Sequence, residues 1–307
     1  MNQERFDKII QEIKTKKLNV ESIIITQNDV EYKNLFTIEF LKNIRSISKT
    51  ITCLALGIAI DKGFFKQGIN TYIMDYFKEI DIDNKNNLEK LVKLQIKHLI
   101  TFTGGYDKQV LNKKHIRTLK DDINLLKAAL NYPLVYDPGE KFVFSNASIY
   151  LLSIIIDKEI GKSLYDFVNQ EMMKKMEIDH FEWDKSREGY TFGATGLKIL
   201  PSDFHKIAKM ILDNGIYKGK QIISSQWLNE MKTLKYLSPE DYVEGRVLPK
   251  YGHGYNFWIC PNEIYYHDGN GGQYMIFIQN KKMVITITSD DEENRHLITE
   301  CIRDVIY

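Results

Sequence analysis

One stretch of the sequence, residues 45–63, reads RSISKTITCLALGIAIDKG. Its apolar residues leave no polar face, which is the pattern of a helix buried on every side, and Gly63 supplies the usual C-terminal cap. We therefore predict a buried helix over residues 46–61. Its first turn carries Ser46 and Lys49 in the spacing Ser-x-x-Lys. Residues three apart lie on one face of a helix, so the hydroxyl and the amine are expected to lie close together.

This pair of side chains suits nucleophilic catalysis. A serine hydroxyl is a weak nucleophile until a base takes its proton, and a lysine can be that base when burial lowers its pKa towards neutrality. The positive end of the helix dipole also stabilises negative charge that develops at Ser46. Taken alone, the spacing is equally consistent with a helix-capping serine and a surface lysine. The rest of the chain must separate these two interpretations.

The flanking patterns predict strand-rich ends and a helical middle. Strands are indicated by β-branched and aromatic runs at residues 22–26, 30–37, 254–260, 264–267, 273–279 and 283–289. Helices are indicated by apolar residues at helical spacing at residues 5–13, 202–212 and 292–306, and through most of residues 69–176. This order predicts an α/β (α+β) sandwich. One antiparallel sheet, built from both ends of the chain, is flanked by helices and carries an inserted, mainly helical lobe.

We expect a single domain over residues 1–307. In it, residues 1–62 and 191–307 are expected to form the α/β region, and residues 63–190 the helical region. Neither a repeat nor a Pro-rich linker interrupts the sequence, and 307 residues are enough for a full core.

Composition and charge narrow the class of protein. Apolar residues make up 43% and charged residues 27%, as in ordinary soluble globular proteins. With 42 basic and 41 acidic side chains, the net charge of +1 provides no field to attract nucleic acid or an anionic membrane. The most apolar run is shorter than the roughly 20 residues of a membrane-spanning helix. The first residues lack a signal-peptide pattern, so we expect a cytoplasmic protein without a membrane span or a nucleic-acid partner.

Neither a metal nor a cofactor is expected. Cys53, Cys260 and Cys301 are widely spaced and form neither a disulfide framework nor a zinc motif. The seven histidines are scattered, without an H-E-x-x-H or Cys/His cluster. Residues 269–272, GNGG, lack the features of a phosphate-binding loop and are predicted to form a turn at a strand end. There, glycine lets a substrate approach the backbone.

Several segments are similar to those of one enzyme family. Residues 45–52, with Gly57 and residues 61–63, resemble the nucleophile helix of class C β-lactamases and their esterase and D-aminopeptidase relatives. Other similar segments follow in the family's order at residues 99–105 (LITFTGG), 138–146 (PGEKFVFSN), 196–197, 202–203, 215–220 (GIYKGK) and 267–273 (HDGNGGQ). The resemblance runs from about residue 35 to 290. It implies the β-lactamase and transpeptidase fold of the penicillin-binding proteins, and a serine hydrolase.

The resemblance implies roles for the matching residues. Ser46 would be acylated by the substrate, and Lys49 would accept or relay its proton. Asn146 would hydrogen-bond Lys49 and the substrate amide. The segment that begins at His267 resembles the family's Lys/His-x-Gly motif on a sheet edge strand, so His267 and Gly269 would line the strand along which the acyl group lies.

The same resemblance implies an oxyanion hole formed by the backbone N–H groups of Ser46 and Asn270. The implied partner is a small-molecule or short-peptide substrate: a β-lactam, a D-amino-acid peptide or a small ester. No cofactor is implied, and the oligomeric state is left open. The lack of an export signal favours an intracellular esterase or peptidase over a cell-wall transpeptidase.

Phe144 departs from the family pattern, because it occupies the position of a tyrosine that assists proton transfer. It would line the substrate site without carrying a proton, and three interpretations follow. Lys49 acts alone, with slower turnover. Alternatively, His267 transfers the proton, so that activity falls as the pH drops through about 6 to 7. Alternatively, the site binds or acylates without efficient turnover, which describes a degenerate or non-catalytic penicillin-binding-like ligand-binding or sensor protein.

Overall fold

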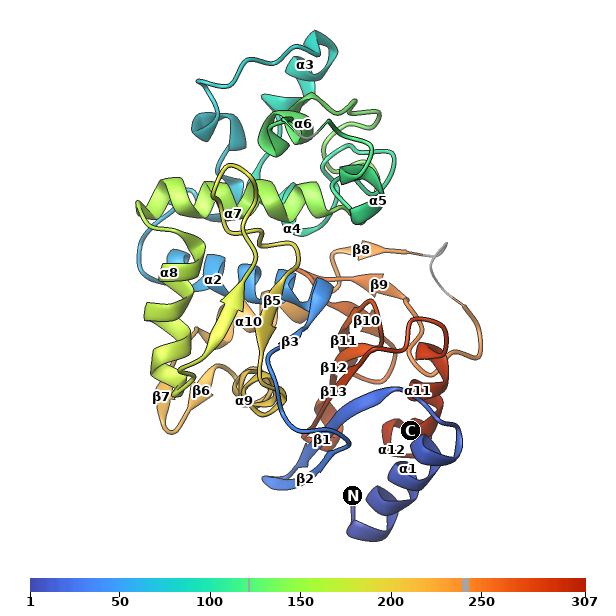
Figure 1. Cartoon of the computed structure of the whole chain (residues 1–307). Coiled ribbons are helices and arrows are strands. Elements are labelled where there is room, and N and C mark those ends of the chain that lie inside the picture. Colours follow the sequence, from blue (N-terminus) through green and yellow to red (C-terminus); the bar gives the residue numbers. More distant parts are fainter. Residues whose placement is uncertain (121, 239–242) are drawn as a thin grey trace.

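A single antiparallel sheet dominates the computed structural model, which describes residues 1–120, 122–238 and 243–307. Within them, its strand order is β2-β1-β13-β12-β11-β10-β9-β8. The strands are β1 (Val20–Gln27), β2 (Val30–Leu35), β8 (Tyr236–Leu237), β9 (Gly252–His253), β10 (Trp258–Cys260), β11 (Ile264–Gly269), β12 (Gln273–Ile278) and β13 (Met283–Ser289). Because β1 pairs with β13, the two ends of the chain meet in the middle of the sheet, as predicted (Figure 1).

Helices cover both faces of this sheet (Figure 1). One face carries α1 (Gln3–Thr15), α11 (Arg295–Cys301) and α12 (Arg303–Ile306). The other carries α2 (Ser48–Asp61), α9 (Pro201–Leu212) and α10 (Ser225–Lys232). Every residue of β13 is buried, as expected for a strand that is covered on both faces. The predicted sandwich is confirmed.

The middle of the chain forms the predicted, mainly helical lobe (Figure 1). Its helices are α3 (Leu88–Leu91), α4 (Ile96–Ile100), α5 (Lys113–Ile116), α6 (Leu125–Asn131), α7 (Asn146–Ile160) and α8 (Leu164–Val168). Helix α7 contacts both α2 and α4, which joins the lobe to the helix that packs on the large sheet. The proposed division of the chain at residues 62 and 190 stays a prediction.

Small strands complete the structure. A three-stranded sheet has the order β3 (Lys42–Asn43), β5 (Leu197–Ile199) and β4 (Phe181–Trp183). A two-stranded sheet consists of β6 (Ile216–Tyr217) and β7 (Lys220–Gln221). The pairing of β3 with β5 holds the chain that enters α2 against residues far along the sequence. No helix in the described ranges is both long and apolar enough to cross a membrane.

Two local predictions near the N-terminus are confirmed. Phe6, Ile9, Ile10 and Ile13 are all buried on one side of α1. The hairpin between β1 and β2 turns at Asn28 and Asp29, with φ values of +48° and +63°. Both residue types tolerate this left-handed conformation, which a tight hairpin turn requires.

Two other predictions were wrong in detail. Of the expected strand at residues 254–260, only 258–260 is strand (β10), while 254–257 forms the turn that joins β9 to β10. In this turn the Gly254 N–H donates to the Phe257 carbonyl at 2.9 Å and Asn256 has φ +62°. The expected final helix divides into α11 and α12 at Ile302, whose φ of −106° departs from helical geometry.

Candidate active site

Ser46 and Lys49 lie together, but not on one continuous α-helix. Arg45–Ile47 forms a 3₁₀ turn, and α2 begins only at Ser48. Arg45 has φ +55°, and its N–H donates to the Asn43 side chain at 2.8 Å. The Ser48 hydroxyl donates to the Arg45 carbonyl at 2.6 Å and accepts from the Leu197 N–H at 3.1 Å. These bonds hold the turn, so that Ser46 remains partly exposed at the start of the buried helix.

The Lys49 amine is placed to exchange a proton with Ser46. Its Nζ lies 3.1 Å from the Ser46 Oγ and donates to the Ala194 carbonyl at 2.6 Å. The side chain is fully buried, and this burial lowers the pKa of Lys49 to about 7, although the negative charge of Asp268 acts in the opposite sense. An amine with this pKa is substantially unprotonated at neutral pH, which is the form a general base needs.

Phe144 covers the Lys49 amine with an aromatic ring. The Lys49 Nζ lies 4.9 Å from the ring centroid. The ring also packs against Phe102, at a centroid distance of 4.6 Å, and stacks on Trp258 at 6.4 Å. An aromatic face stabilises a nearby cation but supplies no proton. Phe144 therefore has no group that could replace the phenol hydroxyl of the family's tyrosine.

Asn146 is positioned differently from the expectation. It is the first residue of α7, and its Nδ2 donates to the Leu111 carbonyl at 3.1 Å. Its Oδ1 is buried and has no hydrogen-bond partner among the described residues. Among the described residues, Asn146 therefore makes no hydrogen bond to Lys49, because its Nδ2 is bonded to the Leu111 carbonyl just before α5. The unpartnered oxygen leaves Asn146 able to accept a hydrogen bond.

β11 carries His267 and Gly269 but is not an edge strand, which corrects the expectation. β11 is the fifth strand of the eight-stranded sheet. However, β10 is only three residues long and pairs with Ile264, Tyr265 and Tyr266. His267 and Gly269 lie beyond it and pair with β12 alone, so the end of β11 has a locally open edge.

Gly269 brings this open end against the turn at Arg45–Ile47. A Cβ added at Gly269 would lie 2.8 Å from the Ile44 carbonyl oxygen and 3.0 Å from the Arg45 Cβ. Only glycine permits such a close approach. The chain then turns through Gly271 and Gly272, which have φ values of +84° and +82°, before β12 begins. The predicted turn at a strand end is confirmed.

His267 is buried and neutral. Its Nδ1 lies 2.7 Å from the Thr50 Oγ1, while its Nε2 is buried without a partner among the described residues. Burial, followed by the positive charge of Lys49, holds the pKa of His267 well below its usual value. A histidine in this state does not titrate between pH 6 and 7, so the acid loss expected for a His267 proton shuttle has no support.

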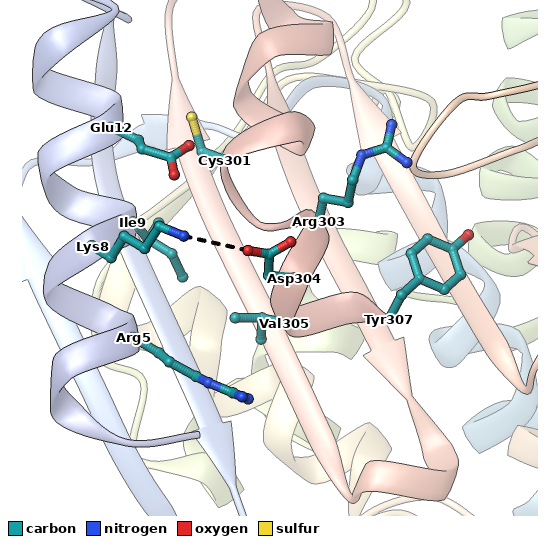
Figure 2. Close-up of a pocket in the computed structure, with 9 residues that line it drawn as sticks. All are labelled: Arg5, Lys8, Ile9, Glu12, Cys301, Arg303, Asp304, Val305 and Tyr307. Carbon is teal, nitrogen blue, oxygen red and sulfur yellow. Dashed lines mark hydrogen bonds and ion pairs between the residues drawn. The ribbon is translucent and has the colours of Figure 1, made fainter.

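A cleft of about 470 Å³ opens over Ser46. Ser46, Phe144 and Asn270 line it, together with Asp107, Gln109, Lys141, Phe142, Val143, Lys250, Trp258, Asp268 and Arg295. This volume suits a small ligand. A larger hollow of about 690 Å³ lies between α1 and the last two helices, where Lys8 pairs with Asp304 at 3.5 Å (Figure 2). None of the site residues expected from the sequence lines that hollow.

Three neighbours of the site were not predicted. The Ala194 carbonyl binds Lys49 through its backbone, which leaves no signal in the side-chain sequence. Thr50 contacts His267, although its position next to Lys49 could have indicated a role. Trp258 contributes a wall of the cleft and donates from Nε1 to the Asp268 carboxylate at 3.2 Å.

Comparison with known proteins agrees with this geometry. The family model described as "Beta-lactamase" matches residues 28–300, which is most of the chain. The chain belongs to the beta-lactamase family. This is a hydrolase family whose members include β-lactamases and related amidases and esterases.

One curated member of the beta-lactamase family, a "Beta-lactamase" from Escherichia coli (strain K12), is 27% identical over 153 residues. The match covers 50% of this chain and only 37% of that protein. The activity and substrates of that whole protein are therefore not carried over to this chain.

Solved structures share the fold. A putative 6-aminohexanoate-dimer hydrolase from Bacillus anthracis has a TM-score of 0.76 and 18% identity, over 95% of this chain and 80% of that one. An octameric penicillin-binding protein homologue from Pyrococcus abyssi has a TM-score of 0.74 and 19% identity, over 98% and 77%. A class C beta-lactamase has a TM-score of 0.74 and 16% identity, over 99% and 96%. At these identities the likeness extends to the fold alone.

Proposed function

We propose that this protein is a serine hydrolase that cleaves an ester or an amide through an acyl-enzyme on Ser46. The contact of 3.1 Å between the Lys49 Nζ and the Ser46 Oγ carries the proposal. It is supported by the burial of Lys49, which keeps a fraction of the amine unprotonated at neutral pH, and by the position of Ser46 in a cleft of suitable size.

The reaction proceeds in two halves. Lys49 takes the proton of Ser46 as the serine oxygen attacks the substrate carbonyl, and the resulting ammonium returns a proton to the leaving alcohol or amine. A water molecule then hydrolyses the acyl-enzyme and releases the acid, with Lys49 again accepting and returning the proton. The backbone N–H groups of Ser46 and Asn270 stabilise the oxyanion in both halves. The close approach of Gly269 to the nucleophile turn supports this last assignment.

Lys49 acts without a tyrosine in this proposal. Phe144 offers no proton, and the buried, neutral His267 is unsuited to a shuttle that requires protonation near pH 6 to 7. Of the three interpretations, a Lys49-only base is therefore best supported. Asn146, through its unpartnered Oδ1, would accept a hydrogen bond from a substrate amide. His267 and Gly269 would shape the open end of β11, beside which the acyl group lies.

The substrate class follows from family membership and from the cleft. β-Lactams, D-amino-acid peptides and small esters all present a carbonyl that the same nucleophile can attack. Small esters suit the site best, because an alkoxide leaving group depends less on a dedicated proton donor than an amine does. The loss of the tyrosine hydroxyl at Phe144 favours such a substrate.

Turnover and trapping test the proposal. The protein is incubated with 4-nitrophenyl acetate and, separately, with benzylpenicillin, and both product release and intact mass are measured. We expect ester turnover, and any penicilloyl adduct should map to Ser46. Ser46→Ala should abolish both signals. Ser225→Ala, which alters an exposed serine on α10, should leave both unchanged.

The alternative function is a penicillin-binding-like sensor without turnover, which the Phe144 ring favours. Such a protein would accumulate a stable Ser46 adduct with benzylpenicillin and release no product from the ester. A protein that neither turns over nor forms an adduct would contradict both functions.

A further inference from the structure

Two side chains of α2 hold neighbouring carbonyls of one segment, residues 193–197. The Lys49 Nζ donates to the Ala194 carbonyl at 2.6 Å. The Thr52 hydroxyl donates to the Gly193 carbonyl at 2.9 Å. Lys49 and Thr52 are three residues apart, so they share the face of α2 that lies against this segment. The proposed reaction gives a role to Lys49 and none to Thr52.

The contact between Thr52 and Gly193 is close and buried. A Cβ added at Gly193 would lie 2.7 Å from the Thr52 Oγ1 and 2.9 Å from the Ser153 Cβ on α7. Thr52 is completely inaccessible to solvent, so bulk water does not compete for the carbonyl. Among the described residues, Thr52 is the one donor to the Gly193 carbonyl, and a buried carbonyl without a donor is costly. The hydroxyl therefore holds the orientation of the Gly193 peptide, which glycine by itself leaves free.

The next contact between α2 and this segment lies further from Ala194. The Ser48 hydroxyl accepts from the Leu197 N–H at 3.1 Å, which holds the end of the segment against α2. Gly196, with φ +87°, lies between this bond and Ala194, and the chain turns there. Thr52 instead holds the residue directly before Ala194. The position of the Ala194 carbonyl therefore depends most directly on Thr52.

Three groups surround the Lys49 amine, and each suits a different part of it. The Ala194 carbonyl can only accept, so it takes an N–H. The Phe144 ring, whose centroid lies 4.9 Å from the Nζ, attracts an N–H and repels a lone pair, because the face of an aromatic ring is negative. The Ser46 hydroxyl, at 3.1 Å, is the one group of these three that can donate. A free amine has two N–H groups and one lone pair, so the lone pair is left for Ser46.

Resting on the proposed function, we propose that Thr52 is a positioning residue for the base. By holding the Gly193 carbonyl, it keeps the adjoining Ala194 carbonyl on one N–H of Lys49. The lone pair of Lys49 then points to Ser46. Without the Thr52 hydroxyl, the Gly193 carbonyl is unpaired, the Ala194 carbonyl shifts, and the amine can also turn its lone pair away from the serine.

The titratable groups near Lys49 lie on β11 and not in this segment. Burial lowers the pKa of Lys49, and the negative charge of Asp268 on β11 acts in the opposite sense. His267, also on β11, is kept neutral by burial, which holds its pKa well below the usual value. The Ala194 carbonyl favours the ammonium, because a charged donor makes the stronger hydrogen bond. Loss of this bond should therefore lower the pKa of Lys49 further, with β11 unchanged.

The titration of Lys49 tests the proposal without any assay of hydrolysis. The full chain is labelled with ¹³C at lysine and followed by NMR, and Lys49→Met assigns the signal. In Thr52→Val, which removes the hydroxyl at nearly constant size, we expect the Lys49 midpoint to fall by about half a pH unit or more. Thr52→Ser should restore it. Thr52→Ala removes the same hydroxyl and replaces the valine variant if that variant does not fold. An unchanged midpoint in the folded variant would overturn the proposal.

Reaction rates test the direction of the lone pair. With 4-nitrophenyl acetate, kcat of Thr52→Val should fall about 10- to 100-fold while KM stays nearly constant, because a misplaced base slows the chemistry and leaves binding intact. Thr288→Val removes an equally buried hydroxyl, paired with Ser22 at 2.8 Å, and should keep the wild-type kcat and Lys49 midpoint. A wild-type kcat in folded Thr52→Val would also overturn the proposal. If the wild type itself shows no turnover, the proposed function fails, and the Lys49 titration still decides whether Thr52 positions the amine.

Discussion

The Phe144 ring lies 4.9 Å from the Lys49 amine and replaces a possible proton donor by an aromatic face. This face favours the ammonium, while burial favours the free amine. Burial prevails, since it lowers the pKa of Lys49 to about 7. The pKa of Lys49, the base of the proposed reaction, is thus determined mainly by its burial.

Restoring the phenol tests this relationship. Phe144→Tyr places a hydroxyl near Lys49 and Ser46, where it can assist proton transfer to the leaving group. We expect kcat for 4-nitrophenyl ester hydrolysis to rise about tenfold or more, within the range for one acid–base group. Phe142→Tyr adds a hydroxyl elsewhere on the same cleft wall and is the matched control. Equal rates for Phe144→Tyr and the wild type would show that a phenol at this position does not limit turnover.

Removing the base should abolish most of the activity. Lys49→Met keeps the length of the side chain but cannot accept the Ser46 proton, so kcat/KM should fall by about 100-fold or more. Thermal unfolding should show that the variant folds, because a methionine suits a fully buried position. Retained activity in a folded Lys49→Met protein would assign the base to another group.

The pH dependence of acylation follows from the lowered pKa of Lys49, which is about 7. The ammonium form cannot accept a proton, so the rate should be low at pH 5 to 6, rise through about pH 7 and level off above pH 8. Initial rates of Ser46 labelling across this range provide the measurement. A rate already at its plateau at pH 5 would mean that Lys49 is not the titrating base.

Gly269 should be intolerant of a side chain. In Gly269→Ala, the new Cβ would meet the Ile44 carbonyl at 2.8 Å and displace the turn that carries Ser46. We expect a loss of about 1–3 kcal/mol of stability, measured by urea unfolding, with a larger loss of acylation. Gly104→Ala is the control, since its Cβ would meet nothing closer than 3.8 Å. If Gly269→Ala acylates at the wild-type rate, the approach of β11 is not needed for the reaction.

His205, which lies outside the candidate active site, should make the folded protein less stable at acidic pH. His205 on α9 bonds Thr26 at 2.8 Å and Thr286 at 2.7 Å, and burial, followed by the charges of Lys209 and Lys33, lowers its pKa to about 3. Its folded-state pKa lies below the unfolded value, so its contribution is present above about pH 6.5 and is lost as the pH falls towards 3.

Urea unfolding at two pH values measures this effect. Between pH 7 and pH 4.5, the lowered pKa of His205 alone should decrease the free energy of unfolding by about 2–3 kcal/mol. His205→Gln should be less stable at pH 7 and should show a smaller loss on acidification. His180→Gln, at an exposed histidine, should keep the wild-type dependence. A wild-type slope in His205→Gln would contradict this assignment.

The parts of the fold that follow local patterns could be predicted from the sequence. The apolar stretch that includes Ile51 and Leu54 indicated a helix buried on all sides, and the run from Met283 to Ser289 indicated a buried strand. These patterns depend on residues close in sequence. The Ser-x-x-Lys spacing predicted the contact between Ser46 and Lys49 for the same reason.

The parts that depend on distant backbone could not be predicted. The position of β11 inside the sheet depends on short strands that form around a positive-φ turn at Asn256. The bond from Asn146 to the Leu111 carbonyl and the bond from Lys49 to the Ala194 carbonyl join side chains to main-chain atoms. A main-chain acceptor is present at every residue, so its location leaves no sequence signal.

One measurement tests the central claim most directly. The wild-type protein is treated with a fluorophosphonate at pH 8, digested and analysed by tandem mass spectrometry. The account predicts a single phosphonylated residue, Ser46, whose labelling disappears in Lys49→Met. An unmodified Ser46 peptide, or an adduct on a different serine, would contradict it.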